Sequence, residues 1–272
     1  MLTLSNDQLE VTILDPNSSE DRLRFGTRFC TGGYIFQVSD RRLGELLSGP
    51  TYPDSFTPID GQGIPDAFHR SPLRDPQDPD RAVLVGIGLC DLAANRVIDS
   101  CDWDVRVGER TLTFRTQQTL GPYSLEMHRR IDVDGRAVRS TTWLQNKGSA
   151  LFAVTWFPHP FFPQPEGDEL CRLSIPFAMR ENAGYETSTS GFISRKNWPW
   201  TTDHYLALDH DAHSPLTVLQ RHPKLGLVAA SFGYVPRFFP IWGNERTFSF
   251  EPFFENTVAP GQELVWWMAY DF

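Results

Sequence analysis

The sequence predicts an all-β protein built as a large antiparallel β-sandwich, and three observations support this prediction. Aromatic residues are frequent, with 20 Phe, 8 Trp and 7 Tyr in 272 residues. The 21 prolines and 20 glycines are spread along the whole chain and separate short aromatic and β-branched runs. Helical periodicity is nearly absent, and we therefore expect a single β domain over residues 1–272.

The clearest strands are predicted in the middle of the chain. Apolar residues alternate with polar ones over residues 103–107, 111–115 and 125–133, and a return strand is expected over residues 137–144. Asp134-Gly135 is a hairpin dipeptide, in which both central residues take positive φ. We expect a meander with one face buried and the other in water.

The remaining elements are predicted from shorter runs. Only residues 40–48 fit a turn of helix, and residues 43–47 fit a strand equally well. Further strands are expected at residues 151–157, 216–220, 226–232, 246–251 and 263–270. Three long irregular stretches, residues 49–81, 158–172 and 187–204, are expected to form the walls of a functional site.

Charge and cysteine content exclude several classes of protein. The net charge of −9 leaves no basic stripe for nucleic acid. No stretch reaches the roughly 18 apolar residues that a membrane helix needs, and the first residues lack the features of a signal peptide. The four cysteines, Cys30, Cys90, Cys101 and Cys171, are far apart and contain no C-x-x-C pair, so we expect reduced thiols in a cytoplasmic protein.

Cofactor and metal motifs are also missing from the sequence. There is no P-loop and no G-x-S-x-G elbow, and Gly61-Gln62-Gly63 lacks the third glycine of a dinucleotide site. The acidic and histidine-rich residues 209–213 are interpreted as a solvated turn with nothing to fix the rings. We therefore expect no cofactor and no catalytic metal.

The first candidate catalytic residue is His159. It follows the apolar run at residues 151–157 and lies between Pro158 and Pro160, which fix the backbone on both sides. An imidazole held rigidly among aromatic residues suits proton transfer near neutral pH. A core histidine satisfied by a backbone carbonyl is the alternative.

The second candidate is Glu251, at the end of the predicted strand and before Pro252. Alternation directs Thr247, Ser249 and Glu251 to the face opposite Phe248. A partly desolvated carboxylate at this position would have a raised pKa and act as a general base. A solvent-facing glutamate is the alternative.

Four short motifs occur together in an order that resembles the aldose 1-epimerase (galactose mutarotase-like) family. They are Asn146-Lys147-Gly148-Ser149, His159-Pro160-Phe161-Phe162, Phe250-Glu251-Pro252 and Gly261 before a last aromatic strand. The resemblance extends from about Leu23 to Phe272. It implies a divergent member with a twisted β-sandwich whose broad concave face binds a monosaccharide or a sugar phosphate.

The resemblance also implies the roles of the two candidates. His159 would be the acid that protonates the ring oxygen, and Glu251 would be the base that removes the anomeric hydroxyl proton. The sugar ring opens, the C1–C2 bond rotates, and the pair closes the other anomer with roles exchanged. We expect the two groups on opposite sides of the anomeric carbon, facing each other across a hollow about as wide as a pyranose.

Four further residues are candidates for substrate binding. Arg28 would hydrogen-bond sugar hydroxyls, because its planar fork matches vicinal diols; a surface ion pair is the alternative. Family members carry a second histidine in an H-G-x-x-R motif, and His69 is the only imidazole in residues 61–70. Asp203 is the candidate for the family's substrate-holding aspartate. Trp242, like the Trp198-Pro199-Trp200 motif, would offer a flat surface to sugar C–H groups or pack in the core.

Two other functions remain open at this stage. One is a carbohydrate-binding protein that keeps the concave site without turnover. The other is a lyase, which would need a basic tyrosine or arginine, or a hydrolase, which would need a second close carboxylate. A monomer and a homodimer are both compatible with the sequence.

Overall fold

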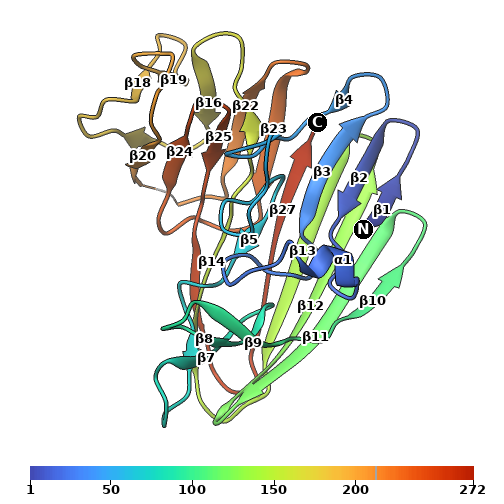
Figure 1. Cartoon of the computed structure of the whole chain (residues 1–272). Coiled ribbons are helices and arrows are strands. Elements are labelled where there is room, and N and C mark those ends of the chain that lie inside the picture. Colours follow the sequence, from blue (N-terminus) through green and yellow to red (C-terminus); the bar gives the residue numbers. More distant parts are fainter. Residues whose placement is uncertain (212) are drawn as a thin grey trace.

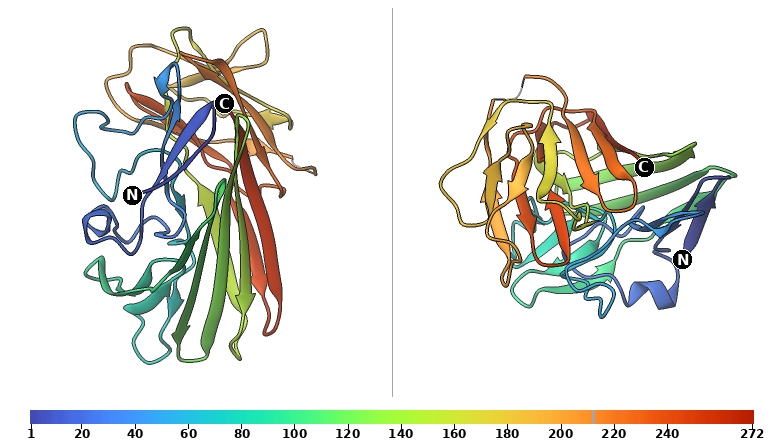
Figure 2. Two further views of the ribbon diagram at one scale, coloured as in Figure 1. Left: turned by 90° about the vertical axis from the view of Figure 1, so that its right-hand side faces the viewer. Right: turned by 90° about the horizontal axis from the view of Figure 1, so that it is seen from above.

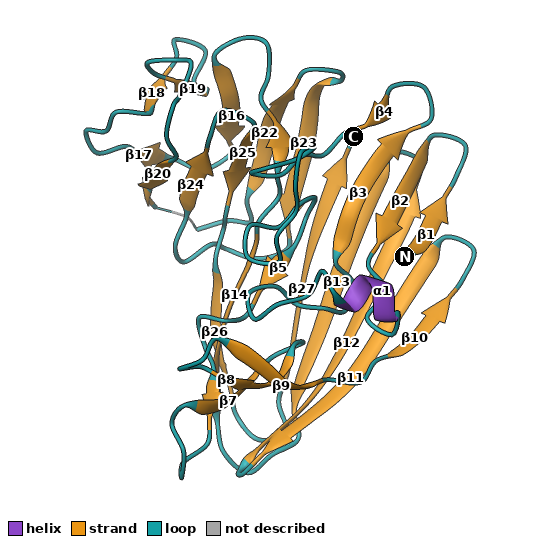
Figure 3. Cartoon of the chain, viewed as in Figure 1, coloured by secondary structure: helices purple, strands orange, loops and turns teal. Residues whose placement is uncertain are grey.

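A computed structural model describes residues 1–211 and 213–272 and confirms an all-β fold with large antiparallel sheets. One long sheet extends through the molecule, and the smaller sheets lie to one side of it (Figures 1 and 3). The main hydrophobic cluster contains residues from both ends of the chain, from Leu4 to Phe272. The sandwich core therefore draws on strands that are far apart in sequence.

The long sheet has ten strands, and its longest members lie side by side along the molecule (Figure 2). In spatial order the strands are β10 (Asp104–Val107), β11 (Thr111–Leu120), β12 (Tyr123–Asp134), β13 (Ala137–Asn146), β27 (Glu263–Asp271), β23 (Gly226–Phe232), β22 (Thr217–His222), β16 (Glu169–Leu173), β19 (Ile193–Arg195) and β18 (Tyr185–Thr187). The predicted meander forms β10 to β13 of this sheet.

Two of the smaller sheets position the candidate residues. The first contains β26 (Phe254–Val258), β14 (Phe152–Pro158) and β5 (Asp66–Ala67). The second contains β15 (Phe162–Pro163), β25 (Thr247–Phe250), β24 (Pro240–Gly243) and β20 (His204–Ala207). His159 lies between β14 and β15, and Glu251 directly follows β25. Both residues therefore lie at the strand ends that the sequence predicted.

The other sheets complete the sandwich. One contains β1 (Leu2–Ser5), β2 (Leu9–Ile13), β3 (Ile35–Asp40) and β4 (Gly44–Glu45). Another contains β6 (Leu73–Arg74), β7 (Arg81–Leu84), β8 (Gly88–Asp91) and β9 (Arg96–Ser100). The last pairs β17 (Phe177–Ala178) with β21 (Asp209–His210).

Local predictions are corrected at two places. The hairpin loop between β12 and β13 consists of Gly135 and Arg136, and only Gly135 has positive φ, at 55°. Glycine at the first central position is the type II′ pattern, whereas the prediction required positive φ at both central residues. Residues 40–48 form a turn and the short strand β4, whereas the helical turn α1 (Ser19–Arg22) lies earlier in the chain.

The physical reason for α1 is a side-chain cap. The Ser18 hydroxyl accepts a hydrogen bond from the backbone N–H of Asp21, and Glu20 and Asp21 lie in the first turn.

No helix in the described part of the chain has the length and hydropathy that crossing a membrane requires.

One buried ion pair connects the long sheet to the strand next to the candidate site. Arg129 occupies the inward-facing parity of β12 and is fully buried. Its guanidinium donates two hydrogen bonds to the Asp66 carboxylate on β5, at 3.0 and 2.6 Å. The indole N–H of Trp156 donates to the same carboxylate, and Arg129 also donates to Thr142. Each charge is thereby neutralised and hydrogen-bonded within the core.

Asp66→Asn is expected to lower the free energy of unfolding by about 3–5 kcal/mol, because it leaves the Arg129 charge buried without a counter-ion. Urea denaturation monitored by circular dichroism measures this change. The matched control is Asp104→Asn, which breaks the exposed Arg106–Asp104 pair and should cost less than about 1 kcal/mol. Equal losses in the two variants would show that the Asp66–Arg129 pair does not support the core.

Candidate active site

A pocket of about 330 Å³ brings together all six residues that the sequence predicted for the site. They are His159, Glu251, Arg28, His69, Asp203 and Trp242. The three long irregular stretches all contribute: residues 49–81 supply His69, residues 158–172 supply His159, and residues 187–204 supply Asp203. These stretches form walls of the pocket, as expected.

The backbone of His159 is fixed by the neighbouring strand β5. Pro158 pairs with Asp66 in the ladder between β14 and β5, and the His159 N–H donates to the carbonyl of Pro65 at 2.8 Å. Two residues on, the Phe161 N–H donates to Gly63 at 2.8 Å. The segment after β14 therefore stays hydrogen-bonded although proline interrupts the strand.

The His159 ring is almost completely enclosed by aromatic side chains. It stacks on Phe161 with a centroid distance of 4.4 Å and an interplanar angle of 28°. Phe29 and Trp242 contact it edge-on, at 6.2 and 6.1 Å. Only 3% of the residue is exposed. This packing fixes the ring plane and leaves the two nitrogens to polar partners.

Both ring nitrogens of His159 contact side chains from the end of β25. Nδ1 lies 2.9 Å from the Ser249 hydroxyl, and Nε2 lies 3.2 Å from the Glu251 carboxyl oxygen Oε1. Ser249 and Glu251 share one strand face, as alternation predicted. The alternative of a histidine satisfied by a backbone carbonyl and that of a solvent-facing glutamate are both wrong.

The direct contact corrects the predicted separation of the two groups. A hollow as wide as a pyranose does not separate them. The reason is strand register: β15 and β25 are antiparallel with Phe162 opposite Phe248. Three residues before Phe162 is His159, and three residues after Phe248 is Glu251, so the same register places these two residues opposite each other. Side chains at opposite positions on one face lie within contact distance.

Burial changes the pKa of both groups in the pair. It raises the pKa of Glu251 to about 7, although Arg28 and Arg70 act in the opposite direction. Burial, together with the charge of Arg28, holds the pKa of His159 well below its usual value. The raised pKa of the carboxyl agrees with the prediction, but the group that titrates near neutral pH is Glu251, not the imidazole.

Arg28 and His69 form a second unit on the pocket wall. Arg28 donates to the carbonyl of Ile59 at 2.6 Å, and its guanidinium lies 4.8 Å above the Phe29 ring. His69 Nδ1 donates to the Arg28 carbonyl at 3.2 Å. Burial, followed by the charges of Arg28 and Arg70, lowers the pKa of His69 to about 4. His69 is therefore a neutral ring at physiological pH.

Trp242 and Asp203 line the pocket from the second small sheet. Trp242 lies on the central strand β24, with Tyr205 opposite it on β20 and Ser249 opposite it on β25. Asp203 is exposed just before β20. Partial desolvation of its carboxyl at the pocket and the nearby charge of Asp60 raise the pKa of Asp203. This side of the pocket offers an aromatic surface with carboxylates beside it.

Sequence reasoning missed four polar residues of the site. Arg70, Asp60 and Tyr205 also line the pocket, and Ser249 contacts His159. Arg70 follows His69 directly, so the expectation for His69 already indicated its neighbourhood. Ser249 has the same parity as Glu251, but its partner lies 90 residues away in the chain. Only the register between β15 and β25 could have identified it.

Two sequence interpretations need correction. Asp209 and His210 belong to strand β21, and His210 Nε2 donates to the Pro236 carbonyl at 3.1 Å, so its ring is fixed. Ala212 lies outside the described residues, and residues 1–211 and 213–272 contain no group of three potential metal ligands. The Trp198-Pro199-Trp200 motif is the other: the ring centroid of Trp198 lies 3.9 Å from the Arg195 guanidinium carbon, and Trp198 does not line the pocket.

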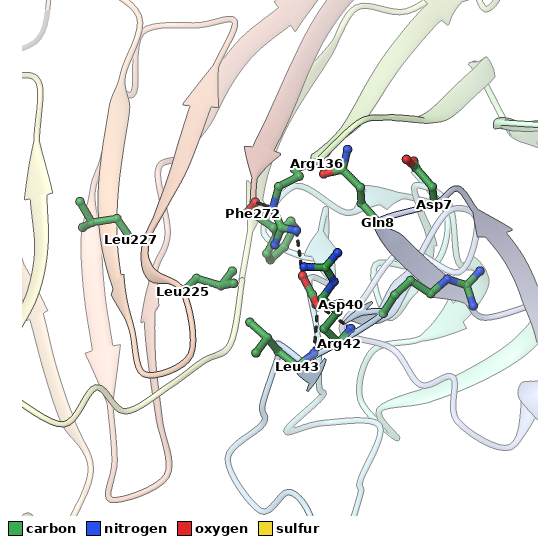
Figure 4. Close-up of a pocket in the computed structure, with 10 residues that line it drawn as sticks. Asp7, Gln8, Asp40, Arg42, Leu43, Arg136, Leu225, Leu227 and Phe272 are labelled. Carbon is green, nitrogen blue, oxygen red and sulfur yellow. Dashed lines mark hydrogen bonds and ion pairs between the residues drawn. The ribbon is translucent and has the colours of Figure 1, made fainter.

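A larger hollow of about 710 Å³ lies between β3 and the end of β27. Figure 4 shows Asp40 and Arg136 pointing toward each other there. Arg136 Nη1 lies 2.8 Å from Asp40 Oδ2. The backbone N–H of Arg42, followed by the Arg136 side chain, lowers the pKa of Asp40 to about 2. Its carboxylate is already fully paired, and the hollow contains no histidine or cysteine. The smaller pocket is therefore the candidate active site.

Glu251→Gln is expected to stabilise the protein at high pH. The pKa of Glu251 is raised in the folded state, so ionisation costs stability as pH increases from about 4.5, and the full cost applies above pH 7. Glutamine avoids a cost of about 3 kcal/mol at pH 8 and gives little advantage at pH 4. Thermal unfolding of both proteins across this range measures the difference. A gain that does not depend on pH would contradict the buried-carboxyl interpretation.

Comparison with solved structures identifies the fold. No protein-family model and no curated protein sequence matches the chain. A galactose mutarotase related enzyme from Lactobacillus acidophilus shares 12% identity and a TM-score of 0.63, over 99% of this chain and 96% of the other. A galactose mutarotase-like protein from Lactobacillus casei ATCC 334 shares 12% identity, with a TM-score of 0.58 over 100% and 99% of the two chains.

A more distant structural relative gives the same result. An aldose epimerase homologue from C. elegans shares 10% identity and a TM-score of 0.53, over 99% of this chain and 97% of the other. The likeness extends over nearly the full length of each chain. The chain therefore has the galactose mutarotase-like fold, with a sequence that diverges widely from the structures that share it.

Proposed function

We propose that the protein is a cofactor-independent aldose 1-epimerase, a mutarotase that interconverts the α and β anomers of an aldose or a sugar phosphate. The observation that carries the proposal is the buried His159–Glu251 pair in a polar pocket. The chain folds like proteins described as galactose mutarotase-related, which supports the same reaction class. His159 and Glu251 are the proposed catalytic residues.

Direct contact between the two groups suits a hemiacetal. The anomeric hydroxyl oxygen and the ring oxygen are bonded to the same carbon, so an acid and a base that serve them lie close together. Glu251 removes the hydroxyl proton, and the released electron pair forms the aldehyde C=O. The bond from C1 to the ring oxygen breaks, and that oxygen takes a proton from Nε2 of His159. Rotation about C1–C2 and the reverse transfers close the other anomer.

The pair needs one proton in total for this cycle. Ring opening converts ionised Glu251 and protonated His159 into protonated Glu251 and neutral His159, and ring closure reverses the change. Burial favours the neutral partners, which raises the pKa of Glu251 and lowers that of His159. In the resting pair Glu251 therefore holds the proton more strongly than His159, and the ionised pair that begins ring opening is the less populated form. Each positioned acid or base contributes about 10²–10⁴-fold to the rate.

The other pocket residues are proposed to bind the sugar. Arg28 offers donors to hydroxyl oxygens, neutral His69 offers its unprotonated Nε2 as an acceptor, and Asp203 accepts hydrogen bonds from sugar hydroxyls. Trp242 presents an aromatic face to the apolar side of the sugar ring.

We further infer a single domain over residues 1–272, because one main hydrophobic cluster contains residues from both ends of the chain. The four free cysteines support a reducing, cytoplasmic location.

Wild-type protein is expected to accelerate exchange between the anomers of a suitable aldose, and His159→Asn and Glu251→Gln are each expected to lower kcat by at least about 10²-fold. Exchange-spectroscopy NMR on glucose, galactose and their 6-phosphates measures the rate. Removing either group breaks the proton cycle, while the aromatic packing around the site remains.

Matched controls are His128→Asn and Glu255→Gln, which change the same residue types outside the pocket. Both should exchange anomers at the wild-type rate. Saturable binding of these sugars without faster exchange in the wild type would instead support the carbohydrate-binding alternative. Full activity in either pocket variant would reject the proposed pair.

Arg70→Ala is expected to raise KM about tenfold for a phosphorylated aldose and much less for the free sugar. Arg28 and Arg70 both line the pocket, and the described pocket residues contain only one ion pair, His159–Glu251. An unpaired guanidinium gives a charge-assisted hydrogen bond to phosphate. Arg74→Ala, outside the pocket, is the control, and equal changes of KM for the two sugars would exclude a phosphate-binding role.

A further inference from the structure

The Ser249 hydroxyl is placed to control His159 from the side away from Glu251. Ser249 is completely buried on β25, and its Oγ lies 2.9 Å from His159 Nδ1. Among the described residues, Ser249 is the side-chain hydrogen-bond partner of Nδ1, and the ring lies among the aromatic side chains of Phe29, Phe157, Phe161 and Trp242. Ser249 thus determines whether Nδ1 is satisfied in this apolar environment.

The chemistry of the imidazole decides which way this hydrogen bond runs. Nε2 faces Glu251 and has to give and take a proton during ring opening and closure. A neutral ring that gives up its Nε2 proton while Nδ1 is bare would become an imidazolate, which is inaccessible at neutral pH. Nδ1 therefore has to keep its proton throughout, and this N–H needs a buried acceptor.

We propose that Ser249 is a positioning residue, whose hydroxyl oxygen accepts the Nδ1–H of His159 and so keeps Nε2 as the nitrogen that exchanges its proton. This inference rests on the proposed epimerase function for its kinetic consequence. The hydrogen bond itself is independent of that function. Ser249 acts through His159 and does not line the pocket.

A neutral hydroxyl suits this position better than a carboxylate. A second acid beside Nδ1 would stabilise the imidazolium and hold the proton on His159. The charged and titratable groups around the ring are Glu251, Arg28 and His69, with Arg70, Asp60 and Asp203 elsewhere on the pocket. Ser249 adds no charge to this set. It orients the ring while leaving the proton free to move.

The first experiment reads the tautomer directly. The ¹⁵N chemical shifts of the His159 ring, measured at pH 6 on the labelled full chain, should show a protonated Nδ1 and an unprotonated Nε2. In Ser249→Ala, Nδ1–H loses its acceptor, so the protonated nitrogen should shift to Nε2, which can donate to Glu251. A wild-type ring with bare Nδ1 at pH 6 would overturn the proposal, whether or not the protein is an epimerase.

The second experiment measures anomer exchange. Ser249→Ala should lower kcat about tenfold, the value of one hydrogen bond, with KM unchanged. Ser249→Thr, which keeps the hydroxyl, should recover most of the rate. The matched control is Thr247→Val, because Thr247 is buried on the same strand face and its hydroxyl donates to Phe162 instead of contacting His159.

These outcomes separate a positioning role from a structural one. If Ser249→Ala and Thr247→Val lose the same kcat and the same thermal stability, Ser249 only supports the fold and the proposal fails. If the wild type does not exchange anomers but shows the expected tautomer shift, the epimerase proposal fails and the role of Ser249 in fixing His159 stands.

Discussion

The buried pair of Arg129 and Asp66 is the constraint on which the rest of the structure depends. An arginine at an inward position of β12 is tolerated only with a counter-ion and with its remaining donors satisfied, and Asp66 on β5 supplies that charge. β5 is only two residues long, so its own ladder bonds hold it weakly. The ion pair anchors it to the long sheet. The residue before Asp66 then holds the backbone of His159, and the residues that follow β5 carry His69 into the pocket.

The electrostatics of the pocket follow from placing two titratable groups in contact where water is largely excluded. Each group alone would lose its charge, because desolvation is the first cause of both pKa shifts. In contact they are proposed to share one proton, and moving it from His159 to Glu251 converts an ion pair into two neutral groups without changing the net charge of the pair. Arg28 and His69 complete this setting, since the neutral His69 ring adds no second cation beside Arg28. Burial therefore shifts the pKa values of His159 and Glu251 more than ion pairing does.

Much of this architecture could be predicted from alternation and from strand-end prolines, and the rest depended on partners distant in sequence. Parity placed Ser249 and Glu251 on one face, and Pro158 and Pro160 marked His159, because both signals are local. Parity equally places Arg129 inside, but nothing near it in sequence points to Asp66. The separation predicted for His159 and Glu251 was wrong for the same reason. It is set by the register of β15 on β25, which joins segments about 90 residues apart.

The chain matches solved structures although no family model and no curated sequence matches it, and this difference has a related explanation. A β-sandwich requires apolar residues at alternating positions, and Val, Ile, Leu, Phe and Trp exchange freely there when volume is kept, so identity falls to 10–12% while the fold persists. The pocket is built where strands of separate sheets end. Its few demanding positions are single residues scattered over the chain, too short to produce a sequence match but fixed in space by hydrogen bonds such as that from His159 to Pro65. Function in this fold therefore has to be inferred from the site, and the proposed site consists of the His159 imidazole, the Glu251 carboxyl and the Ser249 hydroxyl on β25, which contacts the ring.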